Sequence, residues 1–171
     1  MTTQTPAPKT SSPAQVARSI FEALAKKDLD AALDLVAEEA VDDFVAIGRF
    51  EGKSAIRRFF DELLGAFPTF DITVERIVGD KATAVVQWHA TGDFTGGSFQ
   101  GIEPTGKHVE IRGVDVIDIS EGLLRHNTIY YDGASFARQL GMLPKAGSVA
   151  DRTTLHTFNA VTRLRRRLPL R

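Results

Sequence analysis

The fold of this chain is decided by residues 109–132, which read VEIRGVDVIDISEGLLRHNTIYYD. Two runs rich in Val, Ile and Tyr flank Ser120-Glu121-Gly122, a pattern typical of a β-hairpin. Polar side chains interrupt both runs, among them Asp115, His126 and Asn127. A hairpin that served only a hydrophobic core would have little use for these side chains. We therefore predict that one face of the hairpin forms the wall of a pocket.

The turn decides which side chains share a face, because side chains alternate along a strand. A two-residue turn at Glu121 and Gly122 places Asp115 opposite Thr128. Its face is then Asp115, Ile117, His126, Thr128, Tyr130 and Asp132. A three-residue turn places Asp115 opposite Asn127. The second strand then contributes Arg125, Asn127, Ile129 and Tyr131. A slip of one residue exchanges the faces, and the sequence leaves both alternatives open.

The composition is that of an ordinary globular domain. The chain has 171 residues, of which 43% are hydrophobic and 25% charged, which is enough for one domain with a real core. Its formal net charge of -1 argues against wholesale binding to nucleic acid. Because there is no cysteine, disulfides, thiolate metal ligands and cysteine nucleophiles are excluded.

The two ends of the sequence differ from its middle. Residues 1–12 carry a single charge, on Lys9, and we expect a disordered leader without the apolar region of a secretory signal. No apolar run approaches the ~20 residues that span a bilayer, so we expect a cytoplasmic protein without a membrane partner. In residues 146–171, apolar residues at helical spacing and an arginine cluster predict a basic amphipathic helix. It would dock on the domain or on a second subunit; the alternative is RNA, a membrane or an acidic partner.

Residues 13–145 predict an α+β domain. We expect helices over 13–27, 29–36 and 53–64, and strands over 41–47, 70–78 and 82–91. The hairpin and a helical turn over 135–140 follow a glycine-rich connection. This order indicates a cone-shaped, curved antiparallel sheet with about three N-terminal helices on one face. The concave space between them would be a pocket, lined by Phe21, Phe59, Phe60 and Trp88.

The second half of this domain carries a family resemblance. Trp88 leads into TGDFTGG, then PTGK, the hairpin, Asp132 and the closing QLGMLP. Over residues 14–145 the sequence resembles the SnoaL-like polyketide cyclases, or ester cyclases, of the nuclear transport factor 2-like superfamily. Ketosteroid isomerases and limonene-epoxide hydrolases have similar folds, and the superfamily also contains proteins without catalysis.

The resemblance implies an acid/base site. The cyclases are known for one essential acid/base Asp on the last strand, and Asp132 matches it. Many members have His-Trp where this chain has Asn127-Thr128. The segment VDDFVAIGRFEGKSAIRRFF is similar to the isomerase segment that holds the catalytic base, at which Asp43 falls. Asp115 falls near the isomerase's proton-donating Asp, whereas the isomerase's tyrosine donor has no counterpart, because the first helix has Phe21 and no Tyr.

Each candidate also has an ordinary structural role. Asp132 can cap the following helix, and Asp115 can be a paired core carboxylate. Only one of Asp42 and Asp43 can face inward. The predicted catalytic residues are Asp132, Asp115 and His126. The predicted substrate-binding residues are Asp43, Phe21, Phe59, Trp88, Asn127 and Tyr130. No His, Asp or Glu cluster has metal-binding spacing, so we expect neither a metal nor a cofactor.

We predict a cofactor-independent enzyme that acts on an apolar, carbonyl-bearing small molecule. An Asp would remove a proton next to the carbonyl, and an aldol-type cyclisation or an isomerisation would follow. One alternative is a non-catalytic small-molecule-binding or dimerisation module. Another is an epoxide hydrolase that draws an Asp-Arg-Asp set from Arg112, Arg125, Asp115 and Asp132. The enzyme hypotheses fail if Asp115 and Asp132 both face outward. We also expect a homodimer, formed through the convex face of the sheet.

Overall fold

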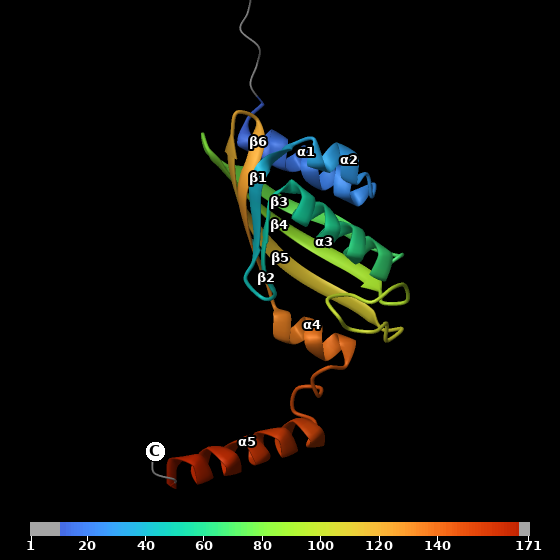
Figure 1. The fold of residues 1–171 in the computed structure, drawn as a ribbon, viewed down its shortest axis with the longest axis vertical. Helices are drawn as coiled ribbons and strands as arrows, with labels where there is room; N and C mark the ends of the chain where they lie inside the picture. The colour runs from blue at the N-terminus through green and yellow to red at the C-terminus, as the bar shows by residue number, and fades with distance from the viewer. Residues whose placement is uncertain (1–10, 168–171) are drawn as a thin grey trace, which may run out of the picture.

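The computed structural model describes residues 11–167, so most of the expected leader lies outside the described residues. This part of the chain is an α+β structure in which helices cover one face of a curved, unclosed sheet (Figure 1). The helices are α1 Pro13–Ala25, α2 Leu29–Leu33, α3 Lys53–Ala66, α4 Gly133–Leu140 and α5 Val149–Arg167. The strands are β1 Val36–Phe44, β2 Gly48–Glu51, β3 Asp71–Gly79, β4 Thr83–Asp93, β5 His108–Ser120 and β6 Leu123–Tyr131.

The helix α1 begins at a complete capping box. The Ser12 side chain accepts a hydrogen bond from the Gln15 backbone N–H, the Gln15 side chain accepts one from the Ser12 N–H, and Pro13 occupies the first turn. The apolar stripe of this helix, including Ile20 and Phe21, is buried in the core. The cap therefore sets where α1 starts, and its stripe attaches it to the concave side of the sheet.

The sheet has the strand order β2-β1-β6-β5-β4-β3. Its neighbours are antiparallel except for β1 and β6, which are parallel. The curved antiparallel sheet that the sequence predicts therefore contains one parallel pair. Residues 48–51, which no expected element covers, form the edge strand β2, and β1 starts five residues earlier than expected. Both differences come from pairing with distant strands, which local periodicity does not report.

The hairpin of β5 and β6 combines features of both alternatives. Glu121 and Gly122 have φ of 56° and 77°, which suits a two-residue type I′ turn, and Ser120 pairs with Leu123. A β-bulge then shifts the register, because Ile119 pairs with Leu124 but Asp118 pairs with His126. The extra residue is Arg125. The inward face after the bulge is Asp115, Ile117, Asn127, Ile129 and Tyr131.

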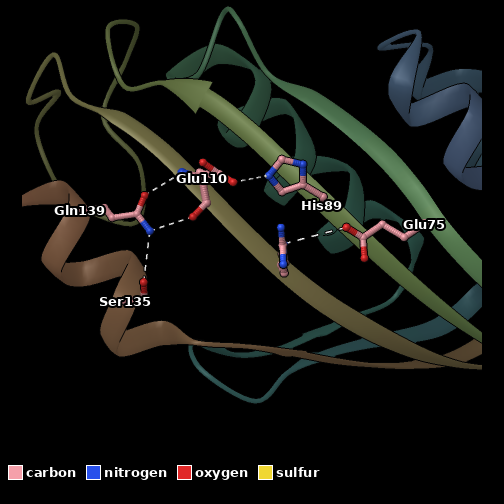
Figure 2. Close-up of polar contacts among 6 residues, drawn as sticks. Glu75, His89, Glu110, Ser135 and Gln139 are labelled. Carbon is pink, nitrogen blue, oxygen red and sulfur yellow. Dashed lines mark hydrogen bonds and ion pairs between the residues drawn. The ribbon is translucent and has the colours of Figure 1, made fainter.

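The helix α4 closes the end of the sheet where β6 has finished. Pairing between β5 and β6 stops at Gly113 and Tyr131, which leaves Glu110 beyond it. The Gln139 side chain replaces the missing strand: its Oε1 accepts from the Glu110 N–H at 2.7 Å, and its Nε2 donates to the Glu110 carbonyl at 2.8 Å (Figure 2). Gln139 Nε2 also lies 3.2 Å from Ser135 Oγ. These bonds hold α4 against β5.

The helix α5 confirms the helix expected in the tail, but it does not dock on its own domain. Figure 1 shows it well apart from the sheet, and no other element of the described chain packs on it. Its apolar side chains are exposed, with Phe158 at 66% and Leu164 at 61%. Among residues 11–167, no helix is long and apolar enough to cross a membrane.

Candidate functional site

An apolar cavity of about 110 Å³ lies between the helices and the concave face of the sheet. Its aromatic lining is Phe21, Phe44, Phe59, Phe60, Phe70, Trp88, Phe99, Tyr131 and Phe136. Among the lining residues of the described chain, polar side-chain atoms come only from Trp88, Asp115, Asn127 and Tyr131. A mostly apolar cavity with a few convergent polar groups is the usual form of a small-molecule site.

Phe59 fixes the wall of this cavity opposite the hairpin. Its ring centroid lies 4.5 Å from that of Phe44, 4.6 Å from Phe50 and 5.2 Å from Phe60. These contacts join α3 to β1 and β2. Aromatic pairs at such distances add to the stability that burial provides. The wall is therefore part of the hydrophobic core, and it does not depend on a loop.

Asp115 lies at the floor of the cavity, where it is only 6% exposed. Trp88 Nε1 donates to its Oδ1 at 2.7 Å, and Asn127 Nδ2 donates to its Oδ2 at 2.9 Å. Burial raises the pKa of Asp115 to about 6, while these two hydrogen bonds act in the opposite direction. A carboxylate oxygen has room for a second hydrogen bond, so this group can still accept a proton from a ligand in the cavity.

Gly113 makes the contact between Trp88 and Asp115 possible. It pairs with Trp88 across β4 and β5, and a Cβ added at Gly113 would overlap the indole ring. Without that Cβ, the indole lies over the β5 backbone and its N–H reaches Asp115, two residues further along. A glycine inside a strand is a known sign of such a close approach.

Asp42, and not Asp43, is the inward-facing carboxyl of β1. Asp42 is 4% exposed and lies beside Asn127 in the parallel register. Burial and then the charge of Asp115 raise its pKa to about 7, against a hydrogen bond from Asn127. Asp43 points to the other face, where its Oδ2 lies 3.8 Å from Arg49 Nε. The expectation that Asp43 reaches the pocket is thus corrected, because alternation along β1 selects its neighbour.

Three other predicted site residues lie outside the cavity. Asp132 is exposed and caps α4, where its Oδ1 accepts from the Ser135 N–H at 2.8 Å. It lines an outer groove with Ser135, Gln139 and Glu110. Beside this groove, His89 Nε2 lies 3.0 Å from Glu110 Oε1 (Figure 2). His126 and Tyr130 are on the outer face of β6, since the bulge turns their neighbours Asn127 and Tyr131 inward.

The structure brings the other candidates together. Phe21, Phe59, Trp88 and Asn127 line the cavity with Asp115, and their part in substrate binding stays a prediction. The Asp-Arg-Asp set of an epoxide hydrolase is not assembled among the described residues. Arg112 lies 4.0 Å from Glu75 on the outer face, and Arg125 pairs with Glu39 and Glu121.

Two ionisable residues were not assigned to the site by sequence reasoning: Tyr131, which lines this cavity, and Asp42, which lines a smaller cavity beside it. Burial raises the pKa of Tyr131 above its usual value, so its hydroxyl remains a proton donor at neutral pH. The signal for both residues is the alternation of side chains along a strand, which for Tyr131 also requires the position of the bulge in β6. In residues 11–167, no group of three His, Cys, Asp or Glu side chains is arranged to hold a metal ion.

The comparisons with known proteins identify the family of the chain. The family model of the SnoaL-like polyketide cyclases matches residues 14–140, and the chain belongs to this family. No curated protein sequence matches it.

Solved structures share the fold at low sequence identity. A protein assigned to the SnoaL-like polyketide cyclases from Jannaschia sp. CCS1 is similar with a TM-score of 0.70 and 19% identity, over 83% of this chain and 100% of that one. IdmH from Streptomyces antibioticus, assigned as a polyketide cyclase, has a TM-score of 0.64 and 21% identity, over 77% and 99%. TsrD from Streptomyces laurentii has a TM-score of 0.66 and 20% identity, over 75% and 94%.

Proposed function

We propose that this protein is a cofactor-independent acid/base enzyme that acts on an apolar, carbonyl-bearing small molecule. The observation that carries this proposal is the buried carboxyl group of Asp115 at the floor of an aromatic cavity, where it accepts hydrogen bonds from Trp88 and Asn127. Membership of a polyketide cyclase family supports the same class of reaction. A base is most effective when its pKa lies near the working pH, and burial moves that of Asp115 to about 6.

The proposed reaction starts with proton transfer to Asp115. One carboxylate oxygen takes the proton from the carbon next to the substrate carbonyl, and the electron pair of that C–H bond moves into an enolate. The enolate carbon then attacks a second carbonyl of the same molecule, which forms the new C–C bond. The resulting alkoxide takes the proton back from Asp115. An isomerisation returns the proton to another carbon instead, and neither route needs a co-reactant.

Tyr131 is the proposed donor to the enolate oxygen. It lines the same cavity, and its hydroxyl stays protonated because burial raises its pKa. A donor placed before the reaction stabilises the charge that develops in the transition state. The aromatic lining excludes water, which strengthens this interaction and protects the enolate.

Asp115→Asn tests the proposal, with Asp118→Asn as the matched control. Asp118 is on the same strand but exposed, where Thr83 Oγ1 donates to it at 3.0 Å. We would incubate full-length protein with a panel of apolar ketones and polyketide-like diketones in D₂O and follow α-proton exchange and cyclised products by NMR. Asp115→Asn should slow turnover by ~10²–10⁴-fold, as expected for a general base.

Three further results complete this test. Tyr131→Phe should slow turnover by ~10²–10³-fold, the usual effect of losing one oxyanion donor. The Asp118 control should keep wild-type rates. Full turnover in Asp115→Asn would contradict the proposal, and so would loss of turnover in Asp132→Asn. Ligand binding without any exchange across the panel would support the non-catalytic binding module.

We also propose that the protein is a homodimer that pairs through the outer face of the sheet. Val114 and Val116 on β5 are partly exposed there, and Tyr130 on β6 is 51% exposed. Sedimentation at micromolar concentration should show twice the chain mass of 18.7 kDa, and Tyr130→Glu should shift it to the monomer. A monomeric wild-type protein would contradict this assignment.

A further inference from the structure

A second, smaller cavity of about 40 Å³ lies next to Asp115. Its polar side chains are Asp42, Asp115 and Asn127, from three strands that are neighbours or near neighbours in the sheet. The helices α1, α2 and α3 contribute only apolar side chains to it, such as Ile20, Leu33 and Ile56. Two carboxyl groups therefore face one enclosed, apolar space.

Two acceptor atoms in this group have no donor. Asp42 Oδ1 and Asn127 Oδ1 are buried without a hydrogen-bond partner among the residues that the structure describes. Leaving a buried acceptor unpaired costs about 1–3 kcal/mol. A proton on Asp42 supplies a hydrogen-bond donor among these acceptors, because a neutral carboxyl group can donate its O–H.

The two carboxyl groups differ in how well they can carry a charge. Asp115 accepts one hydrogen bond at each oxygen, from Trp88 and from Asn127. Asp42 has an unpaired Oδ1 and stands next to the charge that Asp115 carries when ionised. Two like charges in one buried site disfavour each other, so the less solvated group keeps its proton. That group is Asp42.

We propose that Asp42 is a positioning residue that holds a proton while Asp115 is ionised, so that the pair carries one negative charge in the working site. This inference rests on the proposed role of Asp115 as the base. Protonated Asp42 donates within the cavity, stabilises the orientation of Asn127, and thereby keeps the Asn127 amide directed at Asp115. Ionised Asp42 would repel Asp115, and it would have no proton to donate in support of Asn127.

Few other charges can interfere with this pair. Within the described residues, Asp42 and Asp115 are the only titratable groups that line the small cavity. The adjoining aromatic cavity adds Tyr131 from β6, whose pKa burial raises. The charged neighbours Asp43 and Arg49 lie on the opposite face of β1 and β2. The shared proton should therefore be visible as a property of Asp42 and Asp115 alone.

The inference has a consequence for stability that needs no substrate. The folded-state pKa of Asp42 is raised from 3.8 to about 7, so the unfolded chain releases this proton first as the pH increases. The stability that the protonated Asp42 contributes is therefore fully present below pH 3.8 and declines as the pH rises toward 7. Asp42→Asn removes that part of the decline. Its melting temperature relative to wild type should rise steadily between pH 4 and 7.5, whereas Asp43→Asn should show no such trend.

The direct test is a carboxyl titration of the full chain labelled with ¹³Cγ aspartate. Between pH 4.5 and 8.5, the Asp42 signal should report a neutral carboxyl group at a pH where Asp115 is already ionised. In Asp115→Asn the midpoint of Asp42 should fall by about one pH unit, because the neighbouring charge is gone. Asp43→Asn should leave both signals unchanged.

Ionisation of Asp42 together with the surface carboxylates, below pH 5, would overturn the inference. An unchanged Asp42 midpoint in Asp115→Asn would do the same. Should Asp115→Asn not fold, the wild-type titration and the Asp42→Asn melting series decide alone. The proposed function fails separately, through turnover of Asp115→Asn, so a shared proton without catalysis and catalysis without a shared proton are distinguishable results.

Discussion

The two faces of the β5–β6 hairpin have the same kinds of residue and opposite roles. The inner face presents Asp115, Asn127 and Tyr131 to an aromatic cavity. The outer face presents His126 and Tyr130 to the surroundings, although the sequence places Asn127 beside His126 and Tyr131 beside Tyr130. Residue type alone therefore does not identify a site residue on this hairpin. The side of the strand does.

One residue decides which face is which. Beyond the turn, the two-residue loop would place Asp115 opposite Thr128, but the bulge at Arg125 moves it opposite Ile129. This shift turns Asn127, Ile129 and Tyr131 inward. Because the side-chain period of a strand is two, an odd shift exchanges the whole set. The bulge is thus as important for the candidate site as the residues that line it.

Insertion of one Ala between His126 and Asn127 should have the largest effect on this comparison. With this residue added, Asn127, Ile129 and Tyr131 turn outward and Thr128 and Tyr130 turn inward, or β6 loses its pairing with β5. We expect loss of the cooperative folding transition in circular dichroism. Arg125→Ala is the control: it keeps the bulge and removes only partly exposed ion pairs to Glu39 and Glu121, each worth ~0–1 kcal/mol. An insertion variant that folds with wild-type stability would show that the hairpin tolerates an exchange of its two faces.

Gly113→Ala should have the next largest effect. The added Cβ would overlap the Trp88 ring, so the indole must move, and such overpacking typically costs ~1–3 kcal/mol. Moving the ring also weakens its hydrogen bond to Asp115. Gly97→Ala is the matched control, because a Cβ built there meets no heavy atom of the described residues within 4 Å. Urea unfolding measures the stability of both variants. Equal unfolding midpoints would show that the indole adapts to the added Cβ without a loss of stability.

Substitutions at Asp132 should have the smallest effect. Asp132→Ala removes the cap of α4 and should lower stability by about 1 kcal/mol. Asp132→Asn should be nearly neutral for both stability and turnover, because Asn caps as well as Asp and this carboxylate lies outside the cavity. Thermal melting and the ketone assay check the two variants. A loss of turnover in Asp132→Asn with normal melting would restore the role that the family resemblance implies.

Much of the architecture could be predicted from the sequence. The start of α1 at Pro13, the start of α3 at Lys53 and the hairpin around Glu121-Gly122 depend on local signals, and each is present where expected. The family resemblance over residues 14–145 agrees with the match over 14–140. The cytoplasmic location and the domain boundaries stay predictions of the sequence.

The candidate site was only partly predictable, for a physical reason. Phe21, Phe59 and Trp88 could be assigned to the cavity because helical and strand periodicity mark the buried face of their own element. Asp132 ends a strand next to aromatic residues, yet its side chain closes a helix cap, which short-range sequence permits equally well. The choice between such roles needs the path of the chain beyond the element.

The sequence by itself determined the family, the class of fold, and the presence of carboxyl and amide groups within otherwise apolar strands. Only the tertiary structure decided that Asp42 faces inward in place of Asp43, that Tyr131 replaces Tyr130, and that Asp115 receives the Trp88 N–H. These choices follow from a bulge, a parallel strand pair and a missing Cβ. Each of them depends on contacts between residues far apart in the sequence, and local periodicity contains no information about such contacts.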